Sequence, residues 1–189
     1  MRPALLIIDM FSRFDFPDGA RLAPLAARAA RQIARLRNAF DGRGWPVIYA
    51  NDNFGDWKSG LHALADVCRH QEGSTGEIAA RLYPRPDHYV ILKPKHSAFL
   101  ATPLSIVLGK LEVGHLMLTG MALDSCVLAT AIDANSREFH SVVVSDATAV
   151  LPERRPAALG VLRATGGVEV RTTRTVLSAL AADGARSGR

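Results

Sequence analysis

Several features that define other classes of protein are absent from this chain or sparse in it. Its 189 residues include only two cysteines, Cys68 and Cys126, which excludes a framework of disulfides. No apolar run approaches the length of a membrane-spanning helix, and the N-terminus has no apolar signal segment with a cleavage site. We therefore expect a cytoplasmic protein that does not bind membranes.

Lysine is also scarce, and the basic character of the chain comes mostly from scattered arginines and a basic C-terminal segment. The formal net charge is +5, but no basic patch is interleaved with aromatic residues, which make up only 6% of the chain. This pattern is typical of a solvated surface and does not favour binding to nucleic acid. A lysine that directly follows a buried strand is therefore notable.

The chain does contain a regular alternation of short apolar runs with helical patterns. With 48% hydrophobic residues, it is long enough for one compact domain with a sizeable core. Alternating strands and helices are typical of an α/β fold with a mostly parallel sheet. We predict a single domain over residues 1–183 and a basic, disordered tail over 184–189. The six predicted strands cover residues 4–8, 46–50, 89–92, 115–119, 141–145 and 168–170.

Helix signals fill the connections between these strands. The first helix is predicted to begin near Pro24, which is favourable in a first turn, and to end at Gly42. The polar stretch 51–74 predicts a long loop with one short helix. Ser74 and Glu77 have the spacing of a capping box, which predicts the start of the next helix. Further helices are predicted near residues 103–111, 126–139, 152–163 and 172–184.

Chemically reactive side chains follow three of the predicted strands. Asp9 comes directly after the first strand, Lys93 after the third, and Cys126 at the start of the helix after the fourth. Ligands of open α/β sheets bind at the carboxyl ends of the strands, so these residues should share one edge. A thiol at a helix N-terminus faces unpaired N–H groups, which favours the thiolate, although a small buried cysteine is the alternative. Together the three residues provide the nucleophile, base and cation of thiol-based acyl transfer.

Three spaced segments resemble the isochorismatase-like cysteine hydrolases. They are LLIIDM at 5–10, KPKHSAF at 93–99 and GMALDSCV at 120–127, in the order found in the family. The resemblance implies a Rossmann-like, three-layer α/β/α fold with a six-stranded, mostly parallel sheet of order 3-2-1-4-5-6. It also implies a catalytic triad of Asp9, Lys93 and Cys126. Lys93 is preferred to Lys95 because it has the family spacing to the SAF segment.

The resemblance further implies an oxyanion hole and a reaction. A cis peptide precedes this hole in the family, and here it would be Met121–Ala122, with the N–H groups of Ala122 and Cys126 facing the oxyanion. Asp9 would take the thiol proton, Lys93 would lower the thiol pKa, and water activated by Asp9 would hydrolyse the thioester. We therefore predict a hydrolase of C–N bonds, acting on a small amide, carbamoyl or ureido compound without a cofactor.

Nicotinamidases of this family have a metal-binding Asp-x-His after the second strand, and this chain departs from that pattern. Asp52 has no histidine two residues later, and His62 and His70 do not show a recognised ligand spacing, so we expect no metal site. Aromatic and polar side chains near the strand ends could line a substrate pocket, although loop aromatics also commonly pack against their own domain. The residues predicted to bind substrate are Phe14, Asn51, Phe54 and Trp57.

Two other functions fit the sequence. An isochorismatase-type hydrolase would cleave a vinyl ether without releasing ammonia, although members with that activity lack the nucleophilic cysteine in the family pattern. A catalytically silent binding domain would contain a Cys126 that is alkylated as slowly as a free cysteine. By resemblance we also expect a small-molecule substrate and a homodimer or homotetramer. His96 and His115 are expected to be packing or surface residues rather than catalytic bases.

Overall fold

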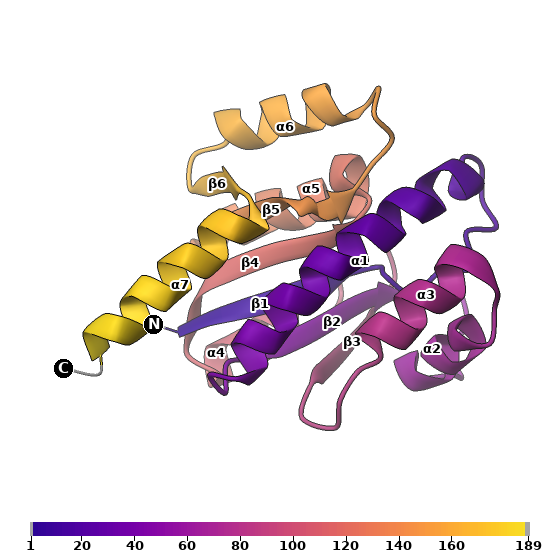
Figure 1. Ribbon diagram of the computed structural model, residues 1–189, viewed down its shortest axis with the longest axis horizontal. Helices are drawn as coiled ribbons and strands as arrows, with labels where there is room; N and C mark the ends of the chain where they lie inside the picture. Colours follow the sequence, from indigo (N-terminus) through magenta and orange to yellow (C-terminus); the bar gives the residue numbers. More distant parts are fainter. Residues whose placement is uncertain (1, 188–189) are drawn as a thin grey trace.

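The computed structural model describes residues 2–187 and shows three layers, with a parallel sheet between two layers of helices (Figure 1). The strand order is β3-β2-β1-β4-β5-β6, and every neighbouring pair is parallel. The predicted fold class and strand order are thus confirmed. The strands are β1 (Arg2–Ile8), β2 (Val47–Asp52), β3 (Tyr89–Lys93), β4 (Val113–Met121), β5 (His140–Ala149) and β6 (Val168–Arg171).

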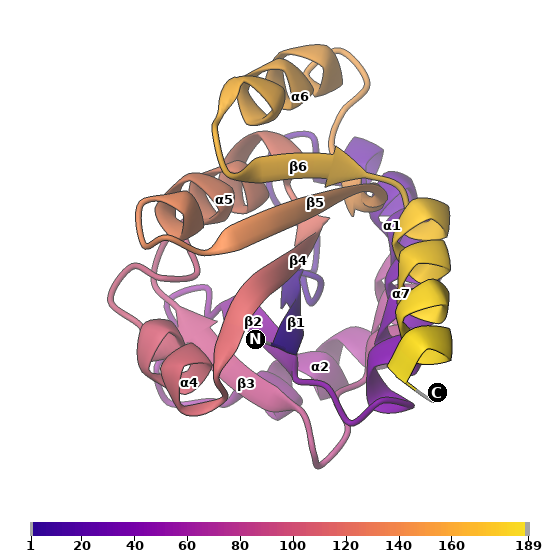
Figure 2. The ribbon, with the colours of Figure 1, turned by 90° about the vertical axis from the view of Figure 1, so that its left-hand side faces the viewer.

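Helices cover both faces of the sheet (Figure 2). The first, second, third and seventh helices pack on one face, and the fourth to sixth pack on the other. Within residues 2–187, none of the helices combines the length and apolar character that a membrane span requires. The helices are α1 (Gly19–Asp41), α2 (Leu61–Arg69), α3 (Gly73–Leu82), α4 (Leu104–Lys110), α5 (Leu128–Asn135), α6 (Arg155–Ala164) and α7 (Thr173–Ser187), and a π-helical turn η1 (Leu123–Val127) precedes α5.

The apolar run of β1 is continuous because this central strand is covered on both faces. Leu5 and Ile7 belong to the core beneath α1, whereas Leu6 and Ile8 belong to the core on the opposite face. All four side chains are buried. Each contributes about 1.5–3 kcal/mol through burial of apolar surface, so β1 anchors both layers of helices to the sheet.

Several element boundaries differ from those predicted, and three of the helices show it most clearly. Helix α1 begins at Gly19, five residues earlier than expected, and contains Pro24 in its second turn, where proline removes a single hydrogen bond. The predicted capping box is absent, because α3 already begins at Gly73 and Ser74 lies inside it. Helix α7 continues to Ser187, since one glycine among alanine and arginine is a small helix penalty. Residues 184–187 of the predicted tail are therefore helical, and 188–189 lie outside the described residues.

The connections reverse direction between β1 and β4, which places a topological switch point at the carboxyl ends of these strands. Here Ile8 is paired with Gly120, and the two backbones approach closely. A Cβ atom on Gly120 would lie 2.0 Å from the carbonyl oxygen of Ile8, and its φ of +110° is unfavourable for other residues. Only glycine lets the two strands meet at this point.

We therefore predict that Gly120→Ala destabilises the protein strongly, by about 3 kcal/mol in the free energy of unfolding. Chemical denaturation followed by circular dichroism measures this change. Gly109→Ala is the matched control, because a Cβ atom on this residue of α4 would meet no neighbouring atom within 4 Å. It should change stability by no more than about 1 kcal/mol. Equal stability of the two variants would contradict the close approach at Gly120.

Candidate active site

Asp9 and Lys93 form a buried ion pair at the switch point. The Lys93 Nζ lies 2.7 Å from Oδ2 of Asp9, and it also donates a hydrogen bond of 2.8 Å to the carbonyl oxygen of Lys95. The other carboxylate oxygen, Oδ1, accepts a hydrogen bond of 2.6 Å from the backbone N–H of Asp52. Asp9 is 7% exposed and Lys93 is 0% exposed. Charges this deeply buried are tolerated because each one is paired and hydrogen-bonded.

Cys126 joins this pair from a different element, the π-helical turn η1. Its Sγ lies 3.6 Å from Nζ of Lys93. The three side chains that the sequence places after three separate strands thus meet at one edge of the sheet. The arrangement contains a thiol, an ammonium group and a carboxylate, with the ammonium group touching the other two.

The surroundings of Cys126 favour its neutral thiol over the thiolate. Burial, followed by the negative charge of Asp9, raises its pKa to about 12, although Lys93 opposes this shift. The expectation that a helix N-terminus and a lysine would produce a low pKa is therefore wrong here. Cys126 lies inside the turn rather than ahead of it, and loss of contact with water outweighs the nearby positive charge.

Asp9 has a complementary property. Burial raises the pKa of its carboxyl group, while the charge of Lys93 lowers it to a smaller extent. A carboxylate whose pKa is raised is a better proton acceptor than an ordinary aspartate. Asp9 is therefore suited to take the proton that Cys126 retains in the free protein.

The segment between β4 and α5 has the backbone geometry of a tight turn next to the thiol. The peptide bond between Met121 and Ala122 is cis. The carbonyl oxygen of Ala122 accepts hydrogen bonds of 3.1 Å from the N–H groups of both Ser125 and Val127. These bonds hold the turn around Cys126 and determine the direction of its backbone.

His96, expected to be a packing or surface residue, also lies close to the thiol. Its Nδ1 lies 3.2 Å from Oγ of Ser125 and 3.9 Å from Sγ of Cys126. His96 is exposed, whereas Asp9 and Lys93, which lie beside the same thiol, are buried. His115 lies instead near the start of β4, where its ring stacks on a second histidine with centroids 5.3 Å apart.

Two of the four residues predicted to bind substrate have structural roles. Phe14 is buried in the core beneath α1, and its ring packs on Phe16 with centroids 6.1 Å apart. Asn51 is buried, and its side chain forms two hydrogen bonds of 3.0 Å with the backbone of Phe11. Asn51 joins β2 to the loop after β1, so the polar atoms of its side chain already have hydrogen-bond partners within the protein.

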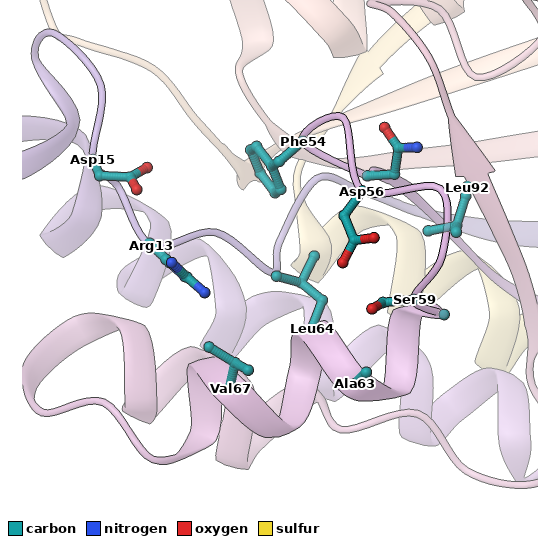
Figure 3. A pocket seen from close by; sticks show the side chains of 11 residues that line it. Arg13, Asp15, Phe54, Asp56, Ser59, Ala63, Leu64, Val67 and Leu92 are labelled. Carbon is teal, nitrogen blue, oxygen red and sulfur yellow. The ribbon is translucent and has the colours of Figure 1, made fainter.

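The other two, Phe54 and Trp57, are 52% and 63% exposed. Phe54 lines a cavity of about 340 Å³ beside α2, together with Leu64 and Leu92 (Figure 3). None of the triad residues lines this cavity. Neighbouring side chains of a strand point to opposite faces, so Leu92 faces α2 while Lys93 faces the thiol.

Asp52, His62 and His70, the candidate metal ligands of the sequence, each contact other groups of the protein. Within residues 2–187, no three His, Cys, Asp or Glu side chains are grouped so as to hold a metal ion. The side chain of Asp52 accepts a hydrogen bond of 2.7 Å from the N–H of Phe54. His62 packs on the ring of Tyr83, and Nδ1 of His70 lies 2.7 Å from the carbonyl oxygen of Asp66 within α2.

Comparison with known proteins identifies relatives along almost the whole chain. The Isochorismatase domain family matches residues 3–175. The isochorismatase family protein YaaI of Bacillus subtilis is 36% identical over 146 residues, which cover 77% of this chain and 80% of YaaI. The ureidoacrylate amidohydrolase RutB of Methylobacterium radiotolerans is 29% identical over 170 residues, covering 76% of this chain and 66% of RutB. The crystal structure of N-carbamoylsarcosine amidase from Thermoplasma acidophilum has a TM-score of 0.71 at 26% identity, covering 92% of this chain and 97% of the amidase.

The protonated state of Cys126 predicts slow alkylation. Near neutral pH, iodoacetamide should modify Cys126 more slowly than a free cysteine, whose pKa is about 8.5, and the rate should still be rising well above that pH. Asp9→Asn should accelerate the modification, because loss of the negative charge lowers the thiol pKa. Mass spectrometry of the peptide that contains Cys126 measures both rates.

Asp133→Asn is the matched control for this substitution. Asp133, on α5, forms an exposed ion pair with Arg137. Loss of this ion pair should leave the alkylation rate of Cys126 unchanged. Rapid modification of wild-type Cys126 below pH 7, or slower modification in Asp9→Asn, would show that the thiol is not held in the protonated state by burial and by Asp9.

Proposed function

Because the chain belongs to the isochorismatase family, we propose that it is a cysteine hydrolase that cleaves a small amide, carbamoyl or ureido compound. The family is hydrolytic and includes amidases. The observation that best supports this function is the contact of Lys93 with both Asp9 and Cys126, at 2.7 Å and 3.6 Å. It combines a nucleophile, a base and a cation at the carboxyl ends of the strands, where substrates of such sheets bind.

In the proposed reaction, Asp9 accepts the proton of Cys126 as the thiolate attacks the carbonyl carbon. The electron pair of the carbonyl bond moves to oxygen, where the N–H groups of Ala122 and Cys126 would stabilise the negative charge. When this intermediate collapses, the C–N bond breaks and the nitrogen takes the proton from Asp9. Ammonia or an amine leaves, and Cys126 remains as a thioester that water hydrolyses.

Proton transfer in this scheme accompanies substrate binding rather than preceding it. The raised pKa of Cys126 keeps the thiolate population of the free protein very small at neutral pH. Lys93, at 3.6 Å from Sγ, stabilises the negative charge as it develops on sulfur. The thiol therefore becomes a nucleophile only when a carbonyl group is present to accept its electrons.

Two similar proteins support a carbamoyl or ureido compound as the substrate class. RutB is named for the hydrolysis of ureidoacrylate, and the Thermoplasma acidophilum enzyme for that of N-carbamoylsarcosine. Both names describe the cleavage of a C–N bond next to a carbonyl group. The same chemistry would use the thiol, base and cation of this chain without a metal or other cofactor, in the cytoplasm.

We further propose a homodimer or homotetramer, which light scattering coupled to size-exclusion chromatography tests.

Two alternatives differ in what they release. Hydrolysis of a vinyl ether would produce no ammonia and would not require Cys126. A silent binding domain would release nothing. Slow alkylation does not separate the silent domain from the amidohydrolase, because the buried thiol is protonated in both cases. Turnover of an amide is therefore the deciding measurement.

We predict that a screen of small amides, carbamoyl compounds and ureido acids finds substrates that release ammonia, measured with a coupled glutamate dehydrogenase assay. Cys126→Ala should lower kcat/KM by at least about 10³-fold, because the thioester cannot form. The matched control is Cys68→Ala, which alters the other cysteine, buried on α2, and should retain turnover. Retained ammonia release in folded Cys126→Ala protein would refute the proposed mechanism.

A further inference from the structure

His96 and Ser125 form a polar pair beside the thiol that the proposed acylation step does not use. Nδ1 of His96 lies 3.2 Å from Oγ of Ser125 and 3.9 Å from Sγ of Cys126, and the Ser125 hydroxyl oxygen is itself 3.9 Å from Sγ. His96 comes from the loop after β3, and Ser125 from the turn η1. The contact with Ser125 keeps Nδ1, rather than the other ring nitrogen, directed at the sulfur.

The exposure of His96 differs from that of Asp9, although both belong to the same site. Asp9 is 7% exposed, and its two oxygens are engaged by the N–H of Asp52 and by Nζ of Lys93. His96 is exposed to solvent. Water that hydrolyses a thioester enters from solvent after the amine has left. It therefore meets the imidazole of His96 more readily than the enclosed carboxylate of Asp9.

Imidazole is suited to this step because histidine takes up and releases protons near neutral pH. We propose that His96 is a further catalytic residue, the general base of thioester hydrolysis, and that Ser125 positions its ring. This inference rests on the proposed function, since it requires a thioester on Cys126. It assigns thioester hydrolysis to the exposed His96 in place of Asp9, the base that the family resemblance implies for this step, and leaves the buried Asp9 as the base of acylation.

The proposed step is balanced within the site. The oxygen of water forms a bond to the thioester carbonyl carbon while one water proton passes to Nδ1 of His96. The C–S bond then breaks, and its electron pair returns to Sγ of Cys126. The proton on Nδ1 returns to this sulfur across the 3.9 Å that separates the two atoms in the free protein. The product leaves as an acid, and both the thiol and the neutral imidazole are regenerated.

The two half-reactions can be separated with p-nitrophenyl acetate as the probe. A burst of p-nitrophenolate reports acylation of Cys126, and the steady-state rate that follows reports hydrolysis of the acetyl thioester. In His96→Gln we expect a burst of wild-type amplitude and a steady-state rate lowered by about 10²-fold. In His96→Ala, added imidazole should restore part of the lost rate, because the position is open to solvent. Ser125→Ala should preserve the burst and lower the steady-state rate by about tenfold.

His70→Gln is the matched control, because it replaces an exposed histidine that caps the C-terminus of α2, outside the site, and should change neither phase. An unchanged steady-state rate in His96→Gln, with a normal burst, would overturn the role of His96 while leaving the proposed function intact. Loss of the burst itself in this variant would also overturn it, because His96 would then be needed for acylation. Release of p-nitrophenolate by Cys126→Ala protein at the wild-type rate would contradict the thioester and therefore both proposals.

Discussion

The buried ion pair between Asp9 and Lys93 is the constraint on which the rest of the site depends. A lysine with no exposed surface requires a carboxylate, and the carboxylate is held in turn by the backbone N–H of Asp52. These contacts join the ends of β1, β2 and β3. Asp9 has a positive φ of 53°, which turns the chain out of β1 and is better tolerated by aspartate than by most residues. Removal of either charge would leave the other buried without an opposite charge beside it.

The burial that this ion pair requires also determines the reactivity of Cys126. Exclusion of water raises the pKa values of the thiol and of Asp9 together, so the proton remains on sulfur until a substrate arrives. An enzyme with a permanently ionised cysteine would be open to alkylation and oxidation at all times. In the proposed mechanism the nucleophile would form beside its electrophile, with Lys93 already in position to stabilise the charge.

The sequence was sufficient for those features that depend on local pattern and strand order. Continuous apolar runs predict the strands, and the position of Asp9 and Lys93 directly after two of them predicts that both lie at one sheet edge. The pKa of Cys126 could not be read in the same way, because it depends on burial by segments distant along the chain. His96 is a surface residue as expected, but its approach to the thiol could not be predicted, because its partner Ser125 is 29 residues away in the sequence. The start of α1 depends on packing of Gly19 against the Phe14 backbone, where a Cβ atom would lie 2.1 Å from the carbonyl oxygen.

The position of Cys126 between a buried and an exposed set of polar groups has a further consequence for specificity. Asp9, Lys93 and Cys126 do not line the cavity beside Phe54, which lies against α2. In the proposed reaction, a substrate at the thiol would meet the turn η1, which carries Cys126 and Ser125, and the loop that carries His96. Differences in substrate choice between this chain and its relatives should consequently arise from these two segments, more than from the strand ends that position Asp9 and Lys93. In the proposed function, the ion pair of Asp9 and Lys93 would define the chemistry of the site, and the exposed segments around the sulfur would select the carbonyl compound that reaches it.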